Sequence, residues 1–600
     1  MIMGEIIENL GERFGVLAES NTHQLTVVAL NTDVAVGDLF LLPCRRGPDR
    51  LYIFRTNQYA NVLNRSLELN EVARNKLAIP GSYLSADLAD EKFLELKGIL
   101  LGYAEWNPIL QTWEFHKPRR LPQHLSDVYR VEYGIPRMHY ILSTLMSDQL
   151  GNSGIYIGNL LAGECALDSV PVYLPVNALS HHIGIFGRTG TGKSNLMMVL
   201  LCSVLKYNYA VSKGDSVGPV ASMFAIDPHD EFRTWHSASG GADGVRGLIA
   251  RYSQTELSRL VDPFYYLSAK DLEYTSFERR IILSRADIIP EDLISISDFT
   301  EHQMAFANQY YAIHGENWIG KLLLGDISLN DSHGEMGTEY LPTTIAAVQR
   351  RLSFLRHGNT RIFKRFDPEA GLLYSSLLPD LICALESGRV IIVDTTLMSE
   401  IEQFLLTTIV ARVLFSLRKA LRSAGSSATL QSEIRQALGN DDTYGQLGMR
   451  SLADELLRRL ATGALPYLSD EKIKTPDSLP YINIVIEEAP SILNPERLRF
   501  GSVFYDISRQ GRKFGIGLTI VSQQISAIDQ RILTQINTEL TMSLGNENER
   551  KEAIRNASAD LLGFEKELQV MGRGQVIISA SYRDIPLTVQ IPEFDNLLPF

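Results

Sequence analysis

The sequence predicts an α/β protein with a RecA-like P-loop NTPase core, an N-terminal β-barrel and a helical insertion. A glycine-rich loop at residues 187–194 lies between a short apolar strand and an apolar helix. Several later apolar strands end in acidic or polar residues, as parallel strands do where they meet at one functional edge. Residues 1–125 contain short strands separated by turns, which is the pattern of a small barrel.

The glycine-rich loop reads GRTGTGKS and fits the phosphate-binding pattern of glycine, four residues, glycine, lysine and serine or threonine. Its glycines let backbone N–H groups turn inward, and the following helix adds partial positive charge at its N-terminus. We expect Lys193 to reach the β- and γ-phosphates of ATP and the Ser194 hydroxyl to bind Mg²⁺. A glycine-rich helix cap is the alternative, but it does not explain the Lys-Ser pair. The residues predicted to bind nucleotide here are Gly187, Arg188, Thr189, Gly190, Thr191, Gly192, Lys193, Ser194 and Asn195.

The composition indicates a multidomain globular protein, because 600 residues exceed a single hydrophobic core. The four cysteines are scattered without a CxxC pair, which disfavours structural zinc and favours a reducing, cytoplasmic location. No signal-peptide pattern opens the sequence, and the most apolar stretch, residues 196–205, is about half as long as a bilayer span. The net charge of −13 argues against a basic coat for nucleic acid, but it permits a ring that is acidic outside and basic in its channel.

The N-terminal half is expected to contain a barrel and the first part of the core. Residues 1–125 form the barrel, with strands at 14–17, 25–30, 38–42, 51–55 and 99–103. Residues 126–232 are a connector followed by the first part of the ATPase core, and 170–174 are expected to be an edge strand because they include Pro171. His181 and His182 are adjacent on a strand and point to opposite faces, so a shared metal ion is not expected.

The C-terminal half is expected to hold the insertion, the rest of the core and a tail. Residues 233–385 are predicted to be a helical insertion, from apolar periodicity at 257–260, 274–283, 302–311, 343–355 and 374–385. Residues 386–585 complete the core, with a polar surface loop of at most two helical turns at 423–444. Residues 586–600 are predicted to be an extended tail that lies across a neighbouring surface.

Acidic residues follow two of the predicted core strands. Asp227 and Glu231 come directly after the strand at 222–226 and face the nucleotide crevice if the strand is parallel; a simple turn with a helix cap is the alternative. Glu487 and Glu488 end the strand at 481–486. We expect Glu487 to hold Mg²⁺ through water and Glu488 to orient and deprotonate the attacking water. The alternative is two exposed charges at a strand end.

Polar and basic residues flank the predicted strand at 517–521. Gln523 follows it and is expected either to touch the γ-phosphate or the attacking water, or to stabilise its loop. Arg509 and Arg512 precede it in the segment SRQGRKFG. An arginine that enters the site of a neighbouring subunit is worth ~10³ to 10⁵ in rate, and Arg512 is the first candidate for this role, Arg509 the second. A basic surface loop or a pore contact is equally compatible with these charges.

Taken together, GRTGTGKS, DPHDE, RVIIVD, IVIEEA and RQGRKFGIGLTIVSQQ resemble the HerA family, hexameric ATPases of the HerA–FtsK branch. The resemblance covers most of the chain, including the barrel. The family typically has DPHGE where this chain has Asp230 in place of glycine, and often Asp-Glu where this chain has Glu487-Glu488. Both differences keep the acidic residues of the pattern.

The resemblance implies ATP-driven translocation or unwinding of double-stranded DNA through a homo-hexameric ring, without a membrane. It also implies an effector partner, either a nuclease in end resection or a nuclease or sirtuin-like NADase in anti-phage defence. Arg497 and Arg499 are candidate pore contacts for DNA, with a solvated loop as the alternative. The competing hypothesis is a scaffold ring that assembles an effector and uses ATP hydrolysis as a switch. A membrane-coupled secretion or conjugation ATPase is disfavoured.

Overall fold

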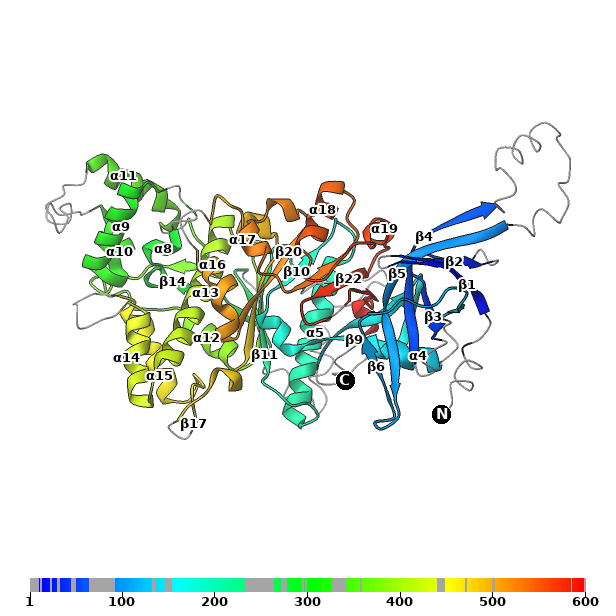
Figure 1. The fold of residues 1–600 in the computed structure, drawn as a ribbon. Coiled ribbons are helices and arrows are strands. Elements are labelled where there is room, and N and C mark those ends of the chain that lie inside the picture. The colour runs from blue at the N-terminus through cyan, green and yellow to red at the C-terminus, as the bar shows by residue number, and fades with distance from the viewer. Residues whose placement is uncertain are drawn as a thin grey trace, which may run out of the picture.

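The computed structural model describes the greater part of the chain, and Figure 1 shows a barrel at one end, a helical region at the other and the core between them. The described residues are 10, 13–21, 24–29, 33–44, 50–63, 92–131, 136–145, 154–232, 264–270, 278–293, 296, 299–325, 341–356, 359–439, 448–469, 472–498, 502–583 and 585–597. Among them, no helix combines the length and the apolar character needed to cross a membrane.

The N-terminal strands close into the predicted barrel. The sheet order is β2-β1-β7-β3-β4-β5-β6, and a further pairing of β2 with β5 closes it. The strands are antiparallel, and alternate residues such as Leu17, Val27 and Phe54 are fully buried inside. The bounds are β1 (Arg13–Ser20), β2 (Leu25–Ala29), β3 (Leu39–Pro43), β4 (Arg50–Leu63), β5 (Lys92–Asn107), β6 (Thr112–His116) and β7 (Asp127–Arg130). Because β7 belongs to the barrel, the barrel extends past residue 125.

The core is one twelve-stranded sheet with the order β13-β12-β16-β11-β19-β20-β10-β21-β22-β23-β8-β9. The strands from β13 to β21 are parallel, and the P-loop strand β10 lies between β20 and β21. The predicted strand before the P-loop and those at 222–226, 481–486 and 517–521 are confirmed as β10 (Ile183–Phe186), β11 (Ala221–Asp227), β19 (Tyr481–Ile486) and β20 (Ile516–Ser522). The core also contains β16 (Val390–Asp394) and β21 (Thr538–Thr541). They are apolar runs because both faces of a parallel sheet are covered.

The range 233–385 contributes strands to this sheet as well as helices. β12 (Phe264–Ser268) pairs with β16, and β13 (Glu278–Arg280) pairs with β12, so the insertion is not purely helical. A helix at 274–283 is wrong for the described part: Ile281 and Leu283 are buried while Ile282 is less so, which is the alternation of extended chain. The segment 257–260 lies outside the described residues. The described part of this range contains the helices α8 (Pro290–Leu293), α9 (Glu301–His314), α10 (Trp318–Leu324), α11 (Pro342–Arg351) and α12 (Leu378–Glu386).

The polar segment after α13 (Glu400–Ser423) is a helix, not the predicted loop. α14 (Ser427–Ala437) begins with a capping box between Ser426 and Thr429. Its apolar residues Leu430 and Ile434 are four apart and fully buried, so they form the single row that packs the helix against its neighbours. The serine-rich composition of the segment concealed this short apolar row. α15 (Arg450–Ala461) follows as predicted.

The C-terminal segment adds two strands to the sheet, between β21 and β8 of the same chain. β22 (Gln575–Ala580) and β23 (Leu587–Gln590) are antiparallel, and β23 pairs with β8 (Gly154–Ala162). Within the predicted tail, residues 587–590 are thus an extended strand of the chain's own sheet, and Pro592 and Phe594 are bonded to Asn195. β9 (Cys165–Pro175) is the outer strand, which confirms an edge strand at 170–174.

A buried ion pair joins the barrel to the core. Arg55 of β4 contacts Glu567 of α19 (Glu565–Val570) with two of its nitrogens, and its Nη2 also donates to Thr588 of β23 over 2.8 Å. Both charged side chains are almost fully buried. The barrel is thus attached to the C-terminal strands that lie beside the P-loop.

Candidate functional site

The P-loop connects β10 to α5 (Lys193–Lys213) at the carboxyl edge of the parallel strands (Figure 1). Gly190 and Gly192 have φ of 80° and 106°, a left-handed conformation that favours glycine and turns successive N–H groups to one side. The Lys193 ammonium donates hydrogen bonds to the carbonyls of Gly187 over 2.8 Å and Arg188 over 3.1 Å. The loop is therefore wrapped around its lysine, as a phosphate cradle requires.

Glu487 follows β19 at the same edge, one strand away from the P-loop strand. Burial, helped by the negative charges of Asp227 and Glu231 and opposed by the attraction of Lys193, raises the pKa of Glu487 to about 8. The pKa of Lys193 is lowered by burial, against the attraction of Glu487 and Glu231. The site therefore combines a half-buried carboxyl with too few cations, which fits a position that receives a divalent metal ion.

Glu488 is exposed and has a left-handed backbone, with φ of 51°. Such a conformation is costly for a residue with a side chain and is typical of functional turns. The turn is held by the Ser491 N–H, which donates to the Glu488 carbonyl over 2.8 Å. The two acids of the turn therefore differ in exposure: Glu487 is half-buried beside Lys193, and Glu488 is open to solvent.

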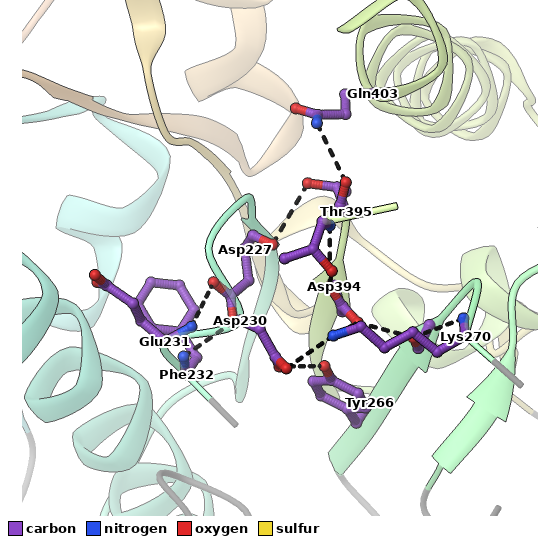
Figure 2. Close-up of polar contacts among 11 residues, drawn as sticks. Asp227, Asp230, Glu231, Phe232, Tyr266, Lys270, Asp394, Thr395 and Gln403 are labelled. Carbon is purple, nitrogen blue, oxygen red and sulfur yellow. Dashed lines mark hydrogen bonds and ion pairs between the residues drawn. The ribbon is translucent and has the colours of Figure 1, made fainter. Parts of the chain in front are cut away.

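Asp227 and Glu231 lie at the end of β11, next to the acid-bearing strand. The two Asp227 carboxylate oxygens accept from the backbone N–H groups of Glu231 and Phe232 over 3.0 and 2.9 Å (Figure 2). Asp227 therefore stabilises the turn after β11, as the alternative of a simple turn with a cap predicts. Burial raises the pKa of Asp227 to about 6, and its charge still acts on Glu487.

Asp230, where the resembled family has glycine, is held by two residues that the sequence did not identify. Its backbone is left-handed, with φ of 55°. Its carboxylate accepts from Tyr266 and Lys270, each over 2.8 Å, and Lys270 also reaches Asp394 over 2.8 Å (Figure 2). Burial alone would raise the pKa of Asp394, but hydrogen bonds from Lys270 and Thr396 lower it. The only sequence signal for Lys270 is its position after the apolar segment 264–268.

Gln523 contacts the P-loop directly. The hydroxyl of Thr189 donates to Gln523 Oε1 over 2.6 Å. Parallel pairing of β20 with β10 aligns Ser522 with Phe186, so Gln523 and the P-loop start from neighbouring strand ends. The structure therefore places Gln523 against the P-loop.

Asn195 uses its side chain within the fold. Its Nδ2 donates to the Pro592 carbonyl and its Oδ1 accepts from the Phe594 N–H, each over 2.9 Å. Because the side chain of Asn195 is already hydrogen-bonded, only its backbone is free to make the predicted contact with nucleotide. The side chain instead fixes the C-terminal segment to the first turn of α5.

Arg509 and Arg512 lie at the opposite edge of the sheet from the P-loop. Arg509 belongs to α16 (Val503–Gln510) and Arg512 to the turn before β20, and both are exposed. The seven residues of β20 separate this turn from Gln523 by about 20 Å, at roughly 3.3 Å per residue. Within one chain these guanidinium groups are thus remote from the P-loop, and the sequence SRQGRKFG could serve only another subunit's site.

The histidine pair before β10 is structural. His182 is buried, and its Nδ1 accepts from the Leu518 N–H over 3.1 Å. Burial lowers the pKa of His182 to about 4, so the ring is neutral at physiological pH. Across the described ranges, no three His, Cys, Asp or Glu side chains come together as metal ligands.

The candidate pore contacts are only partly described. Arg497 lies 5.4 Å from the ring of Phe404 and 4.0 Å from the Glu400 carboxylate, so the solvated-loop alternative stays open. Arg499 lies outside the described residues.

A family model described as "Helicase HerA, central domain" matches residues 155–414. The DNA double-strand break repair helicase HerA of Pyrococcus furiosus is 23% identical over 583 residues, covering 94% of this chain and 89% of the relative. Over most of its length the chain is thus similar to HerA helicases. The HerA helicase of Sulfurisphaera tokodaii is 22% identical over 463 residues, or 76% of this chain and 72% of its own.

The solved structures that match include the plasmid coupling protein TrwB with ADP and Mg²⁺, at 12% identity and a TM-score of 0.38 over 71% of this chain and 89% of that chain. VirB4 of Thermoanaerobacter pseudethanolicus matches at 13% identity and a TM-score of 0.37 over 73% and 96%. At TM-scores this low, the likeness to these structures supports no conclusion about the chain.

Proposed function

We propose that this HerA-like protein is an ATP-hydrolysing, Mg²⁺-dependent motor that acts as a homo-hexamer on double-stranded DNA. The observation that carries the proposal is the position of Glu487 beside Lys193, with a raised pKa and an uncompensated acidic surrounding. A divalent cation bound together with a nucleotide would supply the positive charge that this edge of the sheet lacks. The relatives named as DNA repair helicases direct the proposal toward DNA as the substrate on which the motor acts.

Each residue has a distinct role in the proposed reaction. The loop amides and Lys193 bind the phosphates, while Ser194 and Glu487 hold Mg²⁺, which neutralises charge on the phosphates. Glu488, which is exposed, orients the attacking water and takes its proton. Gln523, already bonded to Thr189, holds the loop or the water near the γ-phosphate. Arg512, with Arg509 as second candidate, completes the site of the adjacent subunit.

The ring is proposed to work with an effector, either a nuclease or a sirtuin-like NADase, and to act in the cytoplasm in DNA repair or anti-phage defence. DNA would be held mainly through its phosphates, so binding should be tolerant of sequence and sensitive to salt. The alternative is an ATP-regulated scaffold ring that activates the effector without processive translocation of DNA.

The test is ATP hydrolysis by the purified protein with and without linear duplex DNA, and with and without the product of the neighbouring gene. A motor is stimulated by DNA alone, whereas a scaffold responds only after the partner is added. Lys193→Ala should abolish hydrolysis in both cases. Hydrolysis that persists at the wild-type rate in Lys193→Ala would refute the ATPase site itself.

A further inference from the structure

A loop from the C-terminal segment packs directly on the P-loop. The Gly574 N–H donates to the Thr191 carbonyl over 2.9 Å. A Cβ placed on Gly192 would lie 3.5 Å from the Gly574 nitrogen, so the two backbones are in contact. Gly574 has φ of 75° and Gly192 has φ of 106°, and both conformations favour glycine. The segment at 571–574 therefore forms one wall beside the phosphate cradle.

A second loop locks this wall to the helix that follows the P-loop. The Ile591 N–H donates to the Gly574 carbonyl over 2.8 Å, and the Asn195 side chain bridges Pro592 and Phe594. We call the two loops, residues 571–574 and 591–594, the strap. Asn195 is 93% buried, with 7% of its surface exposed, so the strap is fixed by a side chain that solvent cannot compete for. The strap is thus a rigid support and not a loose terminus.

Arg573 projects from this support. It is exposed, and its neighbour Gly574 is the residue bonded to the P-loop. Within the described ranges its guanidinium has neither a hydrogen-bond nor an ion-pair partner. Adjacent Cα atoms are about 3.8 Å apart, and an extended arginine carries its guanidinium about 6 Å beyond its own Cα, by standard bond lengths. A phosphate chain on the amides of the P-loop therefore lies within its reach.

We propose that Arg573 binds the phosphate chain of the nucleotide held by the P-loop of its own chain. The proposal rests on nucleotide binding as proposed above and adds a second cation to Lys193. A guanidinium suits this role because it is always charged and can donate two parallel hydrogen bonds to phosphate oxygens. The role differs from that of Arg509 and Arg512, which lie at the far edge of the sheet and can act only on another subunit.

The test is the affinity of the full chain for MgADP, measured by titration calorimetry on Arg573→Ala and Arg573→Lys. Loss of a charged phosphate contact weakens binding by about tenfold or more, and lysine should restore part of the loss because it keeps the charge. Arg555→Ala is the matched control: Arg555 is an arginine on α18 (Glu547–Asn556) whose side chain is 70% exposed. It should bind like wild type.

The outcomes separate this inference from the proposed function. If Arg573→Ala binds MgADP within twofold of wild type while Lys193→Ala loses binding, the inference is wrong and the ATP site stands. If wild type itself shows no saturable binding of MgADP, both are wrong. Mixed rings of Arg573→Ala and Lys193→Ala subunits add a second readout. No recovery of ATPase activity is expected if Arg573 acts in its own chain, and recovery would overturn the assignment.

Discussion

Two carboxyl groups, Glu386 inside the core and half-buried Glu487 at the edge of the sheet, differ in whether nearby cations balance their charge. Glu386, at the end of α12, is completely buried, and Arg418 of α13 donates to it over 2.8 Å while Tyr467 donates over the same distance. Glu487, at the edge of the sheet, faces Lys193 but also Asp227 and Glu231. The charge of Glu386 is balanced by Arg418 of the same chain, whereas Glu487 has more acidic than basic neighbours.

The remaining donors of Arg418 complete the contrast. Its guanidinium also donates to the carbonyls of Pro480 and Phe514 over 3.0 and 3.3 Å. Burial lowers the pKa of Arg418, but the charge of Glu386 raises it above its ordinary value. A pair satisfied in this way needs nothing from outside. The cluster around Glu487 has more acidic than basic groups and gains stability from an added cation, which is why we assign function to it.

The largest expected effect is on the matched pair. Arg418→Met leaves Glu386 buried without its counter-charge, and breaking a buried pair in this way typically costs about 3 to 5 kcal/mol. The measurement is urea unfolding of the purified variant. The double variant Arg418→Met with Glu386→Leu removes both charges and should recover most of the loss. If the double variant is no more stable than the single one, packing and not charge dominates this site.

An intermediate effect is expected for the network of Lys270. Lys270→Met leaves Asp230 and Asp394 facing each other, so it should destabilise the protein by roughly 1 to 3 kcal/mol. Asp230→Gly relieves the left-handed backbone and removes one carboxylate, so the loss from Lys270→Met should be smaller in that background. A double-mutant cycle by thermal unfolding checks this. Strictly additive losses of stability would contradict the energetic coupling that we infer from the contacts of Lys270 in Figure 2.

The smallest effect is expected for Glu487, and it depends on pH. Its pKa is about 8 in the fold against an ordinary value of 4.5, so the folded protein retains a proton that the unfolded chain releases between these values. Stability from this group is therefore complete below about pH 4.5 and is lost as the pH rises toward 8. Without Mg²⁺ and nucleotide, Glu487→Gln should raise the unfolding temperature more at pH 8.5 than at pH 5.

The control for this prediction is Glu496→Gln, a change at an exposed acid of the following loop. It should have the same small effect at both pH values. An equal effect of Glu487→Gln at the two pH values would mean that Glu487 is not held protonated by its surroundings.

The P-loop, the positions of the core strands along the chain and the acid pair could be predicted from the sequence because each depends on a short local pattern. The extended chain around residues 278–284 and helix α14 could not, because a few apolar residues at ambiguous spacing left the decision to packing with distant strands and helices. The same limit applies to Lys270. It reaches Asp230 and Asp394 only because β12 pairs with β16, a contact between segments more than 120 residues apart.

The side-chain contacts of Asn195 could not be predicted for a related reason. It follows a nucleotide-binding motif, so proximity in sequence favoured a nucleotide contact. The partners of its side chain, Pro592 and Phe594, come from the other end of the chain, and no local sequence pattern predicts them. The same distance concealed Arg573, whose relevance follows only from the bond between Gly574 and Thr191.

The most direct test of the account is the rate of ATP hydrolysis by Glu488→Gln, compared with Glu496→Gln and wild type. If the edge of the sheet at Glu487 and Glu488 is the hydrolytic site, Glu488→Gln should bind MgADP like wild type and hydrolyse ATP about 10² to 10⁴-fold more slowly, the usual loss for a general base. Glu496→Gln should hydrolyse at the wild-type rate. Hydrolysis by Glu488→Gln at that same rate would contradict the assignment of the site.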